Sequence, residues 1–340
     1  MKKNESLLFV REIIKRVSRT FAISIALLPG NLGKAVLVGY LLCRIADTIE
    51  DDSSTPSIRR QALLTLFSEC FNNPEKLHEF TTEIACINGD KSYLELLNGT
   101  KMVFDVLYAL PSKSAQIVWD WTQKLTLGMH EFVEKYPAGI HIKSMQEFHR
   151  YCYYVAGTVG HMLTELFYYH SAFINNKTHN KLLLSSEAFG EALQIVNILK
   201  DIAWDCEFEN DVFIPEEILI KNGSNQANIL SVEYRAQNYT ALKTIIELAD
   251  NNIAKALEYF YTLPRMAITI RLFCLVPIIF AIATLREIKN TNVMLAQGGT
   301  VKISRKEVKS LLSTCFIVVI SNKLTARLAS KVSIKPYLFF

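Results

Sequence analysis

Two clusters of acidic residues, about 150 residues apart, lie within apolar, helix-forming stretches of this chain. Asp47, Glu50 and Asp51 form the first cluster, and Asp201 and Asp205 belong to the second. Side chains three or four residues apart share one face of an α-helix, so each set brings its carboxylates together. Carboxylates held close together in apolar surroundings repel one another unless a cation compensates them. Hard divalent ions bind through carboxylate and phosphate oxygens, so the pattern predicts a helical protein that holds a diphosphate through Mg²⁺.

An arginine accompanies the first cluster. Arg44 precedes Asp47 by three residues and Asp51 follows Asp47 by four, so all three side chains share a helix face. A guanidinium in that place can orient a diphosphate while the acids hold metal. The same residues also fit an ordinary acidic helix end with one i, i+3 salt bridge. This cluster alone therefore leaves both interpretations open.

The second cluster forms a regular stripe. Asn197, Asp201 and Asp205 recur every four residues, and Lys200 lies beside the stripe, where its ammonium could reach a phosphate. A solvent-exposed polar helix face would give the same spacing. However, residues 192–196 just before it are too apolar for a freely solvated helix, which favours a functional site.

A tyrosine-rich stretch at 151–160 carries two glycines inside a helical pattern. A glycine in a helix costs about 1 kcal/mol relative to alanine. Gly157 and Gly160 therefore suggest a close approach between helices or a ligand against the backbone. The neighbouring tyrosines, Tyr154 among them, offer hydroxyl groups at the edge of an apolar wall. Tight core packing with an aromatic stripe is the alternative.

Composition indicates the elements that must position these residues. The chain has 340 residues, half of them hydrophobic, with only 13 glycines and 9 prolines. Few helix breakers and long periodic runs favour an all-α fold, and the absence of a composition shift favours a single domain over residues 1–340. A net charge of +4 is too small to indicate nucleic-acid binding. Seven scattered cysteines without metal-ligand spacing are typical of reduced thiols in a cytoplasmic protein.

Turn-rich segments divide the chain into eleven expected helices. Their approximate ranges are 5–28, 34–50, 57–72, 77–86, 91–109, 112–135, 144–173, 181–206, 232–261, 266–288 and 304–330. The apolar stretches 272–285 and 311–320 are shorter than the ~18–20 residues of a membrane span, so we expect core helices there. The Phe-Phe end and the positive mean hydropathy leave peripheral membrane contact open.

Taken together, these segments resemble the squalene and phytoene synthase family over roughly residues 15–310. The resemblance rests on five segments: Ser18-Arg19-Thr20-Phe21, RIADTIEDD at 44–52, LGMHEF at 127–132, YCYYVAGTVG at 151–160 and NILKDIAWD at 197–205. It implies a single large helical bundle of the isoprenoid-synthase type with a central apolar cavity. It also implies a prenyltransferase of isoprenoid biosynthesis, on a route to sterols, hopanoids or carotenoids.

Two C-terminal segments are similar to the squalene-synthase branch of that family. Residues 273–277 with 281–285 resemble the helix that lines the second half-reaction, and 301–306 resembles the basic stretch associated with NADPH use. A core helix and a solvated basic turn are the alternatives for these segments. No glycine-rich dinucleotide fingerprint occurs, so an NADPH site here is not of the Rossmann type.

The resemblance implies that two farnesyl diphosphates join head to head, form presqualene diphosphate, and are reduced by NADPH to squalene in an Mg²⁺-dependent reaction. The implied metal ligands are Asp47, Glu50, Asp51, Asp201 and Asp205. The implied diphosphate-binding cations are Arg19, Arg44 and Lys200, and the implied acid/base residue is Tyr154. Pocket-lining residues are expected at Phe21, Gln194, Asn197, Phe273, Cys274 and Pro277. The residues expected to bind NADPH are Lys302, Arg305 and Lys306.

One position departs from the family pattern. An arginine usually stands four residues before the proline that follows the second acidic motif, but Asp211 stands four residues before Pro215 here. Losing that cation should weaken one phosphate site unless Lys200 or Lys221 compensates. Other activities stay open: a presqualene diphosphate, phytoene or dehydrosqualene synthase without the reductive step, a non-catalytic assembly factor, or a terpene cyclase. We expect a monomer in the cytoplasm or at the membrane periphery.

Overall fold

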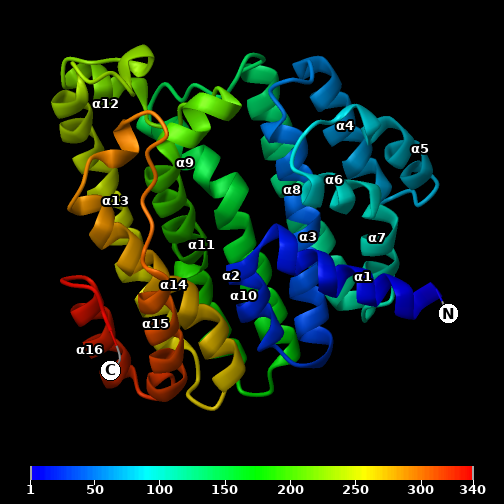
Figure 1. Cartoon of the computed structure of the whole chain (residues 1–340). Helices are drawn as coiled ribbons and strands as arrows, with labels where there is room; N and C mark the ends of the chain where they lie inside the picture. Colours follow the sequence, from blue (N-terminus) through cyan, green and yellow to red (C-terminus); the bar gives the residue numbers. More distant parts are fainter. Residues whose placement is uncertain (1, 339–340) are drawn as a thin grey trace. The chain divides into compact units, whose positions relative to one another are not determined.

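The structure is a computed structural model that describes residues 2–338, except for the side chains of Lys2, Lys3 and Arg19. Within that range, sixteen α-helices follow one another, joined by short 3-10 and π-helical turns (Figure 1). The one extended pairing among the described residues is an isolated bridge between His141 and Val212. The prediction of an all-α fold is confirmed.

The chain divides into two compact units. Unit 1 comprises Met1–Gly139 and His161–Ser171, and unit 2 comprises Ile140–Gly160 and Ala172–Phe340. The boundary therefore falls inside helix α10 (Thr158–His170). The sequence-based assignment of one domain over residues 1–340 stays a prediction.

Unit 1 is built around helix α3 (Gly30–Asp51), which packs against α1, α4, α7 and α8. Most of its side chains from Leu32 to Glu50 are buried. The other elements of this unit are α1 (Lys2–Val17), α2 (Arg19–Ala26), α4 (Ser57–Cys70), α5 (Lys76–Glu83), η1 (Ile84–Cys86), α6 (Lys91–Asn98), α7 (Thr100–Tyr108) and α8 (Ser112–Lys135).

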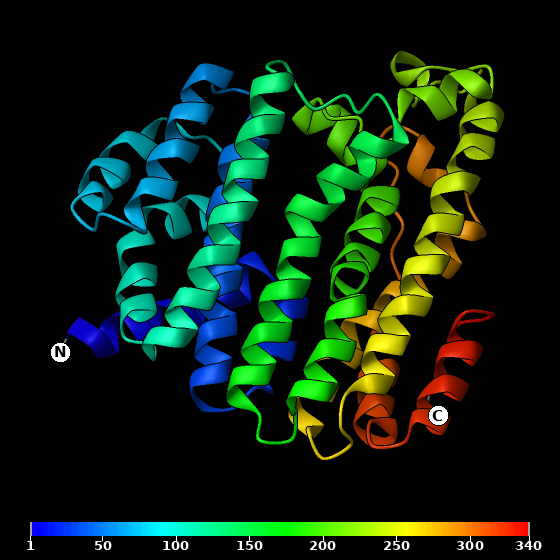
Figure 2. The same ribbon diagram turned by 180° about the vertical axis from the view of Figure 1, so that it is seen from behind.

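Unit 2 is built around the long helix α11 (Asn176–Trp204), which packs along α13 (Arg235–Thr262) and α14 (Ile268–Lys289) (Figure 2). The remaining elements are α9 (Met145–Cys152), η2 (Tyr153–Gly157), η3 (Asp205–Glu209), α12 (Glu216–Lys221), η4 (Gln226–Asn228), η5 (Val293–Leu295), α15 (Arg305–Val318) and α16 (Asn322–Val332). Of these, η2 and η3 are π-helical turns.

Three expected helices are interrupted, so their predicted ranges were wrong. The range 5–28 breaks at Ser18, whose backbone is extended and whose hydroxyl accepts a hydrogen bond from the Phe21 N–H as the cap of α2. The range 91–109 breaks at Gly99, where a β-carbon would clash with the ring of Phe9 on α1. The range 304–330 breaks before Ser321, which caps α16 in the same way as Ser18 caps α2.

Glycines allow two backbones to meet in unit 2. A β-carbon on Gly160 would collide with the carbonyl oxygen of Ser186 on α11, and one on Gly190 would collide with the carbonyl oxygen of Ala156. A β-carbon on Gly157 would lie 3.0 Å from the Glu187 side chain. The predicted close helix approach at Gly160 is therefore confirmed, and Gly190 is its counterpart on α11.

Helix α14 is a core helix of unit 2. The most apolar 18 residues of this 22-residue helix have a mean hydropathy of 2.3. This helix and the stretch Asn176–Glu209 are both long and apolar enough to cross a membrane by length and composition alone. Yet 78% of the most apolar window of α14 is buried inside the protein. Such burial is typical of the core helix of a soluble protein, as expected for residues 272–285. All seven cysteines are free thiols.

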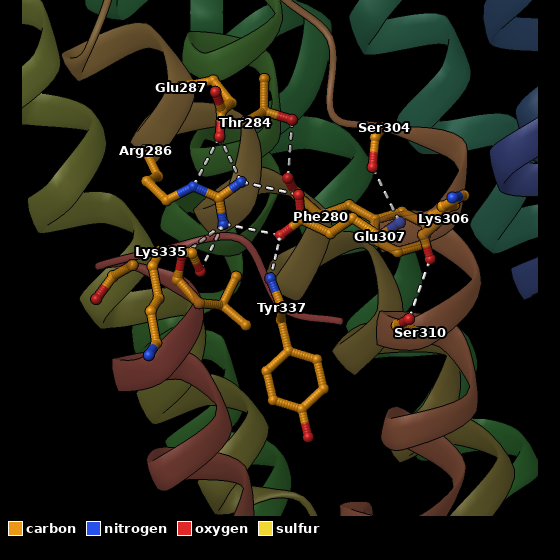
Figure 3. A network of polar contacts seen from close by, with 12 residues as sticks. Phe280, Thr284, Arg286, Glu287, Ser304, Lys306, Glu307, Ser310, Lys335 and Tyr337 are labelled. Atoms are coloured by element: carbon orange, nitrogen blue, oxygen red, sulfur yellow. Dashed lines mark hydrogen bonds and ion pairs between the residues drawn. The ribbon is translucent and has the colours of Figure 1, made fainter. Parts of the chain in front are cut away.

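A buried ion pair fixes the beginning of α15 to α14. Arg286 Nη1 lies 2.8 Å from Glu307 Oε1, and both side chains are almost inaccessible (Figure 3). The same guanidinium donates to the carbonyl oxygens of Val332 and Lys335, while the Tyr337 N–H donates to Glu307. The pair thus satisfies its hydrogen-bonding capacity and ties the C-terminal segment to the start of α15.

We expect Gly160→Ala to destabilise the protein. The added methyl group has no space against the Ser186 carbonyl, so α10 and α11 must separate, at a cost of about 3 kcal/mol. Chemical denaturation monitored by circular dichroism measures this change. Gly89→Ala is the control, because nothing lies within 4 Å of its β-carbon position. Equal stability of the two variants would contradict the close packing at Gly160.

Candidate active site

The first acidic cluster occupies the C-terminal turns of α3 in unit 1. Carboxylate oxygens of Asp47, Glu50 and Asp51 lie within 4.8 Å of one another, as the helical spacing predicted. Glu50 is only 2% exposed, and the other two side chains are half-buried. Three carboxylates so close together and so little solvated form a donor set that suits a hard divalent cation.

Arg44 lies beside this cluster and forms an ion pair with Asp47. Its guanidinium also lies 5.9 Å from the ring centre of Tyr40 and 5.6 Å from that of Tyr93. Burial alone would lower the pKa of Arg44, but the charge of Asp47 and the hydrogen bond to Tyr40 outweigh it, so that pKa lies well above its ordinary value. Arg44 is therefore a permanent positive charge at the edge of the acidic cluster.

Asp52, the last acid of the first motif, has a different environment. Its carboxylate accepts hydrogen bonds from Ser54, from the Thr55 hydroxyl at 2.7 Å and from the Asn88 N–H at 3.0 Å. Burial would raise the pKa of Asp52, but these hydrogen bonds outweigh burial and lower it. Asp52 thus organises the loop after α3, and the structure separates this structural acid from the cluster.

The N-terminal motif lies at the start of α2. Phe21 is half-buried, and its ring centre lies 5.4 Å from that of Tyr40, the residue that also contacts Arg44. Within unit 1, the predicted pocket residue Phe21 and the predicted diphosphate-binding residue Arg44 therefore share a neighbour. The side chain of Arg19 lies outside the described residues.

The second acidic cluster lies where α11 gives way to η3 in unit 2. Asp201 is in the last turn of α11, and Asp205 is the first residue of η3. Burial, together with the charges of Glu209, Asp201 and Asp211, raises the pKa of Asp205 to about 9. This carboxyl group therefore carries a proton at neutral pH unless a cation stabilises its charge. The ammonium of Lys200 pairs with Asp201.

Asp211, the position that departs from the family pattern, is buried and has a structural role. Its Oδ1 accepts a hydrogen bond of 2.5 Å from the Ile140 N–H, and the Val212 N–H donates to the Ile140 carbonyl at 2.7 Å. Asn210 just before it has a left-handed backbone with φ of 58°. An acid at 211 thus fastens the chain after η3 to the segment before α9.

The candidate acid/base residue, Tyr154, lies in the π-helical turn η2. Its ring centre is 5.6 Å from that of Tyr153, and the Arg150 guanidinium carbon lies 5.8 Å from it. Its carbonyl accepts a hydrogen bond of 2.7 Å from the Thr158 hydroxyl. The turn η2 lies between α9 and α10, and η3 ends α11, both at candidate site residues. Turns of the π type are frequent at functional sites.

The predicted pocket residues of unit 2 come from two packed helices. Gln194 is half-buried and Asn197 is exposed on α11, one to two turns before Asp201. Phe273, Cys274 and Pro277 are all buried in α14, which packs on α11. The two sets of residues thus belong to neighbouring elements.

The predicted cofactor residues surround the beginning of α15. Lys302 precedes the helix, Arg305 and Lys306 are its first two residues, and all three are exposed. The loop before them is attached to the second acidic motif, because the Gly298 N–H donates to Glu207 of η3 at 2.9 Å. A direct hydrogen bond therefore connects this loop with the π-turn that contains Asp205.

Comparison with known proteins decides the family. The model of the squalene/phytoene synthase family matches residues 14–307, most of the chain. The chain belongs to the squalene/phytoene synthase family. Squalene synthase of Dictyostelium discoideum is 30% identical over 302 residues, which cover 88% of this chain and 68% of that protein. Squalene synthase of Solanum lycopersicum is 28% identical, covering 86% of this chain and 68% of that protein.

Solved structures agree with that assignment. A ligand complex of the protein named TcSQS has 25% identity and a TM-score of 0.82, and the match covers 96% of this chain and 90% of that one. A dehydrosqualene synthase with ligand shares the fold at 17% identity and a TM-score of 0.58. The chain is therefore a member of a prenyltransferase family, and it spans about two thirds of the length of the curated relatives named above.

Sequence reasoning missed one titratable group near the family motifs. Glu191 on α11 is buried, and its carboxylate accepts a hydrogen bond of 3.1 Å from the Asn252 amide on α13. Burial and the charge of Glu187 raise the pKa of Glu191 to about 7, while Asn252 and Lys255 act in the opposite direction. An acid inside the apolar run before Asp201 is the signal that could have identified it.

We expect Glu191→Gln to remove a pH dependence of stability. The pKa of Glu191 is about 7 in the folded protein, against 4.5 for an ordinary glutamate, so the protein loses stability as pH rises between these values. At pH 8 the amide should therefore raise the free energy of unfolding by about 3 kcal/mol, and at pH 4 the two proteins should be equal. Urea denaturation at both pH values tests this, with exposed Glu247→Gln as the control. A uniform change at both pH values would contradict it.

Proposed function

We propose that this protein joins two farnesyl diphosphates head to head, through presqualene diphosphate, and reduces the product to squalene with NADPH in an Mg²⁺-dependent reaction. The observation that carries the proposal is the set of three α3 carboxylates within 4.8 Å of one another beside the permanently charged Arg44. Membership in the family supplies the reaction class.

The acidic clusters fit Mg²⁺ by their chemistry. Asp47, Glu50 and Asp51 would hold the ion on α3, and Asp201 and Asp205 would do so in unit 2. The raised pKa of Asp205 supports this assignment, because a bound cation would replace the proton that otherwise neutralises the cluster. When bound, Mg²⁺ would neutralise the departing diphosphate and make it a better leaving group.

Cationic side chains would hold the diphosphate oxygens. Arg44 stays charged at every physiological pH, and its planar guanidinium matches phosphate geometry. Lys200 pairs with Asp201 and could transfer its contact to a phosphate when metal occupies the acids. Arg19 is proposed for the same role from its motif. Orientation of two substrates by fixed cations converts their encounter into an intramolecular step.

Tyr154 would move the proton that leaves when the cyclopropane ring closes. Its π-turn interrupts the regular helix and so gives this phenol a direction that the α-helical repeat would not. This role requires the Tyr154 hydroxyl to lie within hydrogen-bond distance of the carbon that releases the proton.

Apolar side chains would protect the allylic cation from water. Phe273, Cys274 and Pro277 on the buried helix α14 would form a dry apolar wall in unit 2, and Phe21 would do the same in unit 1. Gln194 and Asn197 would provide its polar edge near the diphosphate. Water at such a cation would give an alcohol in place of the hydrocarbon, so exclusion of solvent controls the product.

The start of α15 fits the phosphate groups of NADPH. Lys302, Arg305 and Lys306 place three cations at a helix N-terminus, where the helix dipole disfavours positive charge. A bound phosphate would relieve that repulsion and accept hydrogen bonds from the first turn. NADPH, when bound, would supply the hydride that quenches the final cation.

Incubation of the purified protein with farnesyl diphosphate and Mg²⁺, with and without NADPH, tests the proposal. Mass spectrometry should identify squalene only when NADPH is present. An unchanged product with and without NADPH would favour a presqualene diphosphate or dehydrosqualene synthase. Acceptance of geranylgeranyl diphosphate would favour a phytoene synthase, and inertness toward all substrates would contradict the proposal.

We expect Asp47→Asn and Asp201→Asn each to reduce turnover by at least about 100-fold, because each removes a negative charge from its proposed metal site. Diphosphate release from farnesyl diphosphate measures turnover, and circular dichroism should show unchanged helix content. Asp120→Asn, an exposed position on α8, is the control and should keep normal activity. Near-normal rates in either site variant would contradict the metal assignment.

Tyr154→Phe should slow formation of presqualene diphosphate by about 100-fold with little change in substrate KM, since it removes only the proton-carrying hydroxyl. Single-turnover measurements of that product test the expectation. Tyr169→Phe, at an exposed tyrosine, is the matched control. A variant with a raised KM and an unchanged kcat would assign Tyr154 to substrate binding.

We further propose that the enzyme is a monomer of the cytoplasm that works at the membrane periphery and feeds isoprenoid biosynthesis. A substrate with a farnesyl chain and a hydrocarbon product both partition into lipid, which supports such a place. Size-exclusion chromatography with light scattering measures the oligomeric state.

A further inference from the structure

A group of exposed apolar side chains lies at one end of unit 2. Phe316 and Ile317 lie at the end of α15, Ile320 lies in the turn after it, and Leu324 lies in the first turn of α16. Ile317 is the most exposed of these four side chains, at 62%, so it contributes little to the core. We call these four side chains, together with Met266 and Ile268 of the segment before and at the start of α14, the apolar tip.

The two parts of the apolar tip are joined through Arg271. Its buried guanidinium donates to the carbonyl oxygens of Phe260 and Leu263 at the end of α13, and to Val319 at the end of α15. It also donates to the Asn322 side chain at the start of α16. The end of α15, the start of α16 and the segment between α13 and α14 accordingly lie together at the same end of unit 2 (Figures 1 and 2).

Cations flank the apolar tip, and acids are missing from its sequence. Residues 308–340 contain no Asp or Glu, and neither do residues 259–286. The cations of the first range are Lys309, Lys323, Arg327, Lys331 and Lys335. Three of them recur every four residues along α16, and all three are exposed: Lys323, Arg327 and Lys331. An exposed row of positive charge thus runs back from the tip along one helix.

We propose that the apolar tip and the α16 cations form a docking surface for an anionic lipid bilayer. Apolar side chains at a membrane interface enter the boundary between head groups and acyl chains, while neighbouring Lys and Arg side chains attract anionic head groups. The charge pattern selects this occupant, because residues 308–340 carry five cations and no acid, which complements lipid phosphates. Asp250 of α13 lines the groove beside α16, but its carboxylate is paired with Lys289. The inference assigns a surface to the membrane location proposed above and rests on that proposal, but vesicle binding is measured without substrate, so its failure would leave the proposed reaction untouched.

Vesicle sedimentation with the full chain and no substrate tests the proposal. The protein should sediment with phosphatidylcholine vesicles containing roughly one third phosphatidylglycerol, and much less with phosphatidylcholine alone. Raising salt from about 0.1 M to about 1 M shortens the Debye length from about 10 Å to about 3 Å and should weaken binding. No binding to the anionic vesicles at low salt would overturn the proposal.

Two sets of variants locate the surface. Lys323→Glu should weaken binding to anionic vesicles by at least about fivefold. Lys243→Glu makes the same change of charge at an exposed position on α13 and should have a smaller effect. Phe316→Ser with Ile317→Ser and Ile320→Ser should lower binding at all salt concentrations. Ile220→Ser with Val232→Ser is its control, since both residues are exposed elsewhere on unit 2. Equal losses in variants and controls would overturn the proposal.

Sedimentation velocity separates lipid from a second copy of the chain as the occupant. The wild-type protein should remain the same size as the triple serine variant in solution. A dimer that this variant dissociates, together with absence of vesicle binding, would assign the apolar tip to self-association. Circular dichroism should be unchanged in every variant, because all substituted side chains are exposed. An unchanged spectrum excludes unfolding as the cause of lost binding.

Discussion

Repulsion between carboxylates on one helix face is the constraint on which the candidate site depends. In unit 1, three acids share the end of a buried helix, and one of them, Glu50, is nearly inaccessible to water. In unit 2, burial and then the charges of Glu209, Asp201 and Asp211 raise the pKa of Asp205 to about 9. Neither arrangement is favourable by itself, because close like charges in apolar surroundings destabilise the folded state. Folding must therefore hold each cluster in place through contacts made elsewhere.

Those contacts are unusually direct in unit 2. Gly160 and Gly190 let the backbones around η2 and α11 touch, which removes side chains as flexible spacers. Two buried arginines then bind backbone carbonyls at helix ends: Arg271 at the ends of α13 and α15, and Arg286 at the end of α16. Touching backbones and helix ends held by arginines make unit 2 a rigid framework, which opposes the repulsion between its acids.

The sequence predicted features that depend on neighbours along the chain. The faces formed by Asp47, Glu50 and Asp51 follow from helical periodicity, and the structure places their oxygens together. Range 112–135 was predicted without error because Pro111 marks its beginning. The breaks at Ser18 and Ser321 were missed because serine caps resemble ordinary polar residues of an amphipathic helix.

Features that depend on distant partners could not be predicted. Asp211 looked like the loss of a phosphate-binding cation, but its carboxylate binds Ile140, 71 residues away. Glu191 owes its raised pKa to burial and to its environment between helices that only the fold brings together. The roles of Lys302, Arg305 and Lys306 rest on sequence resemblance, supported by their place at the start of α15.

The π-turns η2 and η3 also bear on how this chain tolerates insertions and deletions. A π-turn contains one residue more than the α-helical repeat needs, so removing a single residue within Asp205–Glu209 would restore a regular helix there. Each residue of an α-helix turns the chain by about 100°, and the π-turn absorbs the rotation that its extra residue would otherwise impose. Asn210 and the chain after it would therefore keep their direction relative to α11 after that deletion. A single-residue deletion should thus be tolerated better within Asp205–Glu209 than in the regular part of α11, where it would rotate everything beyond it by about 100°.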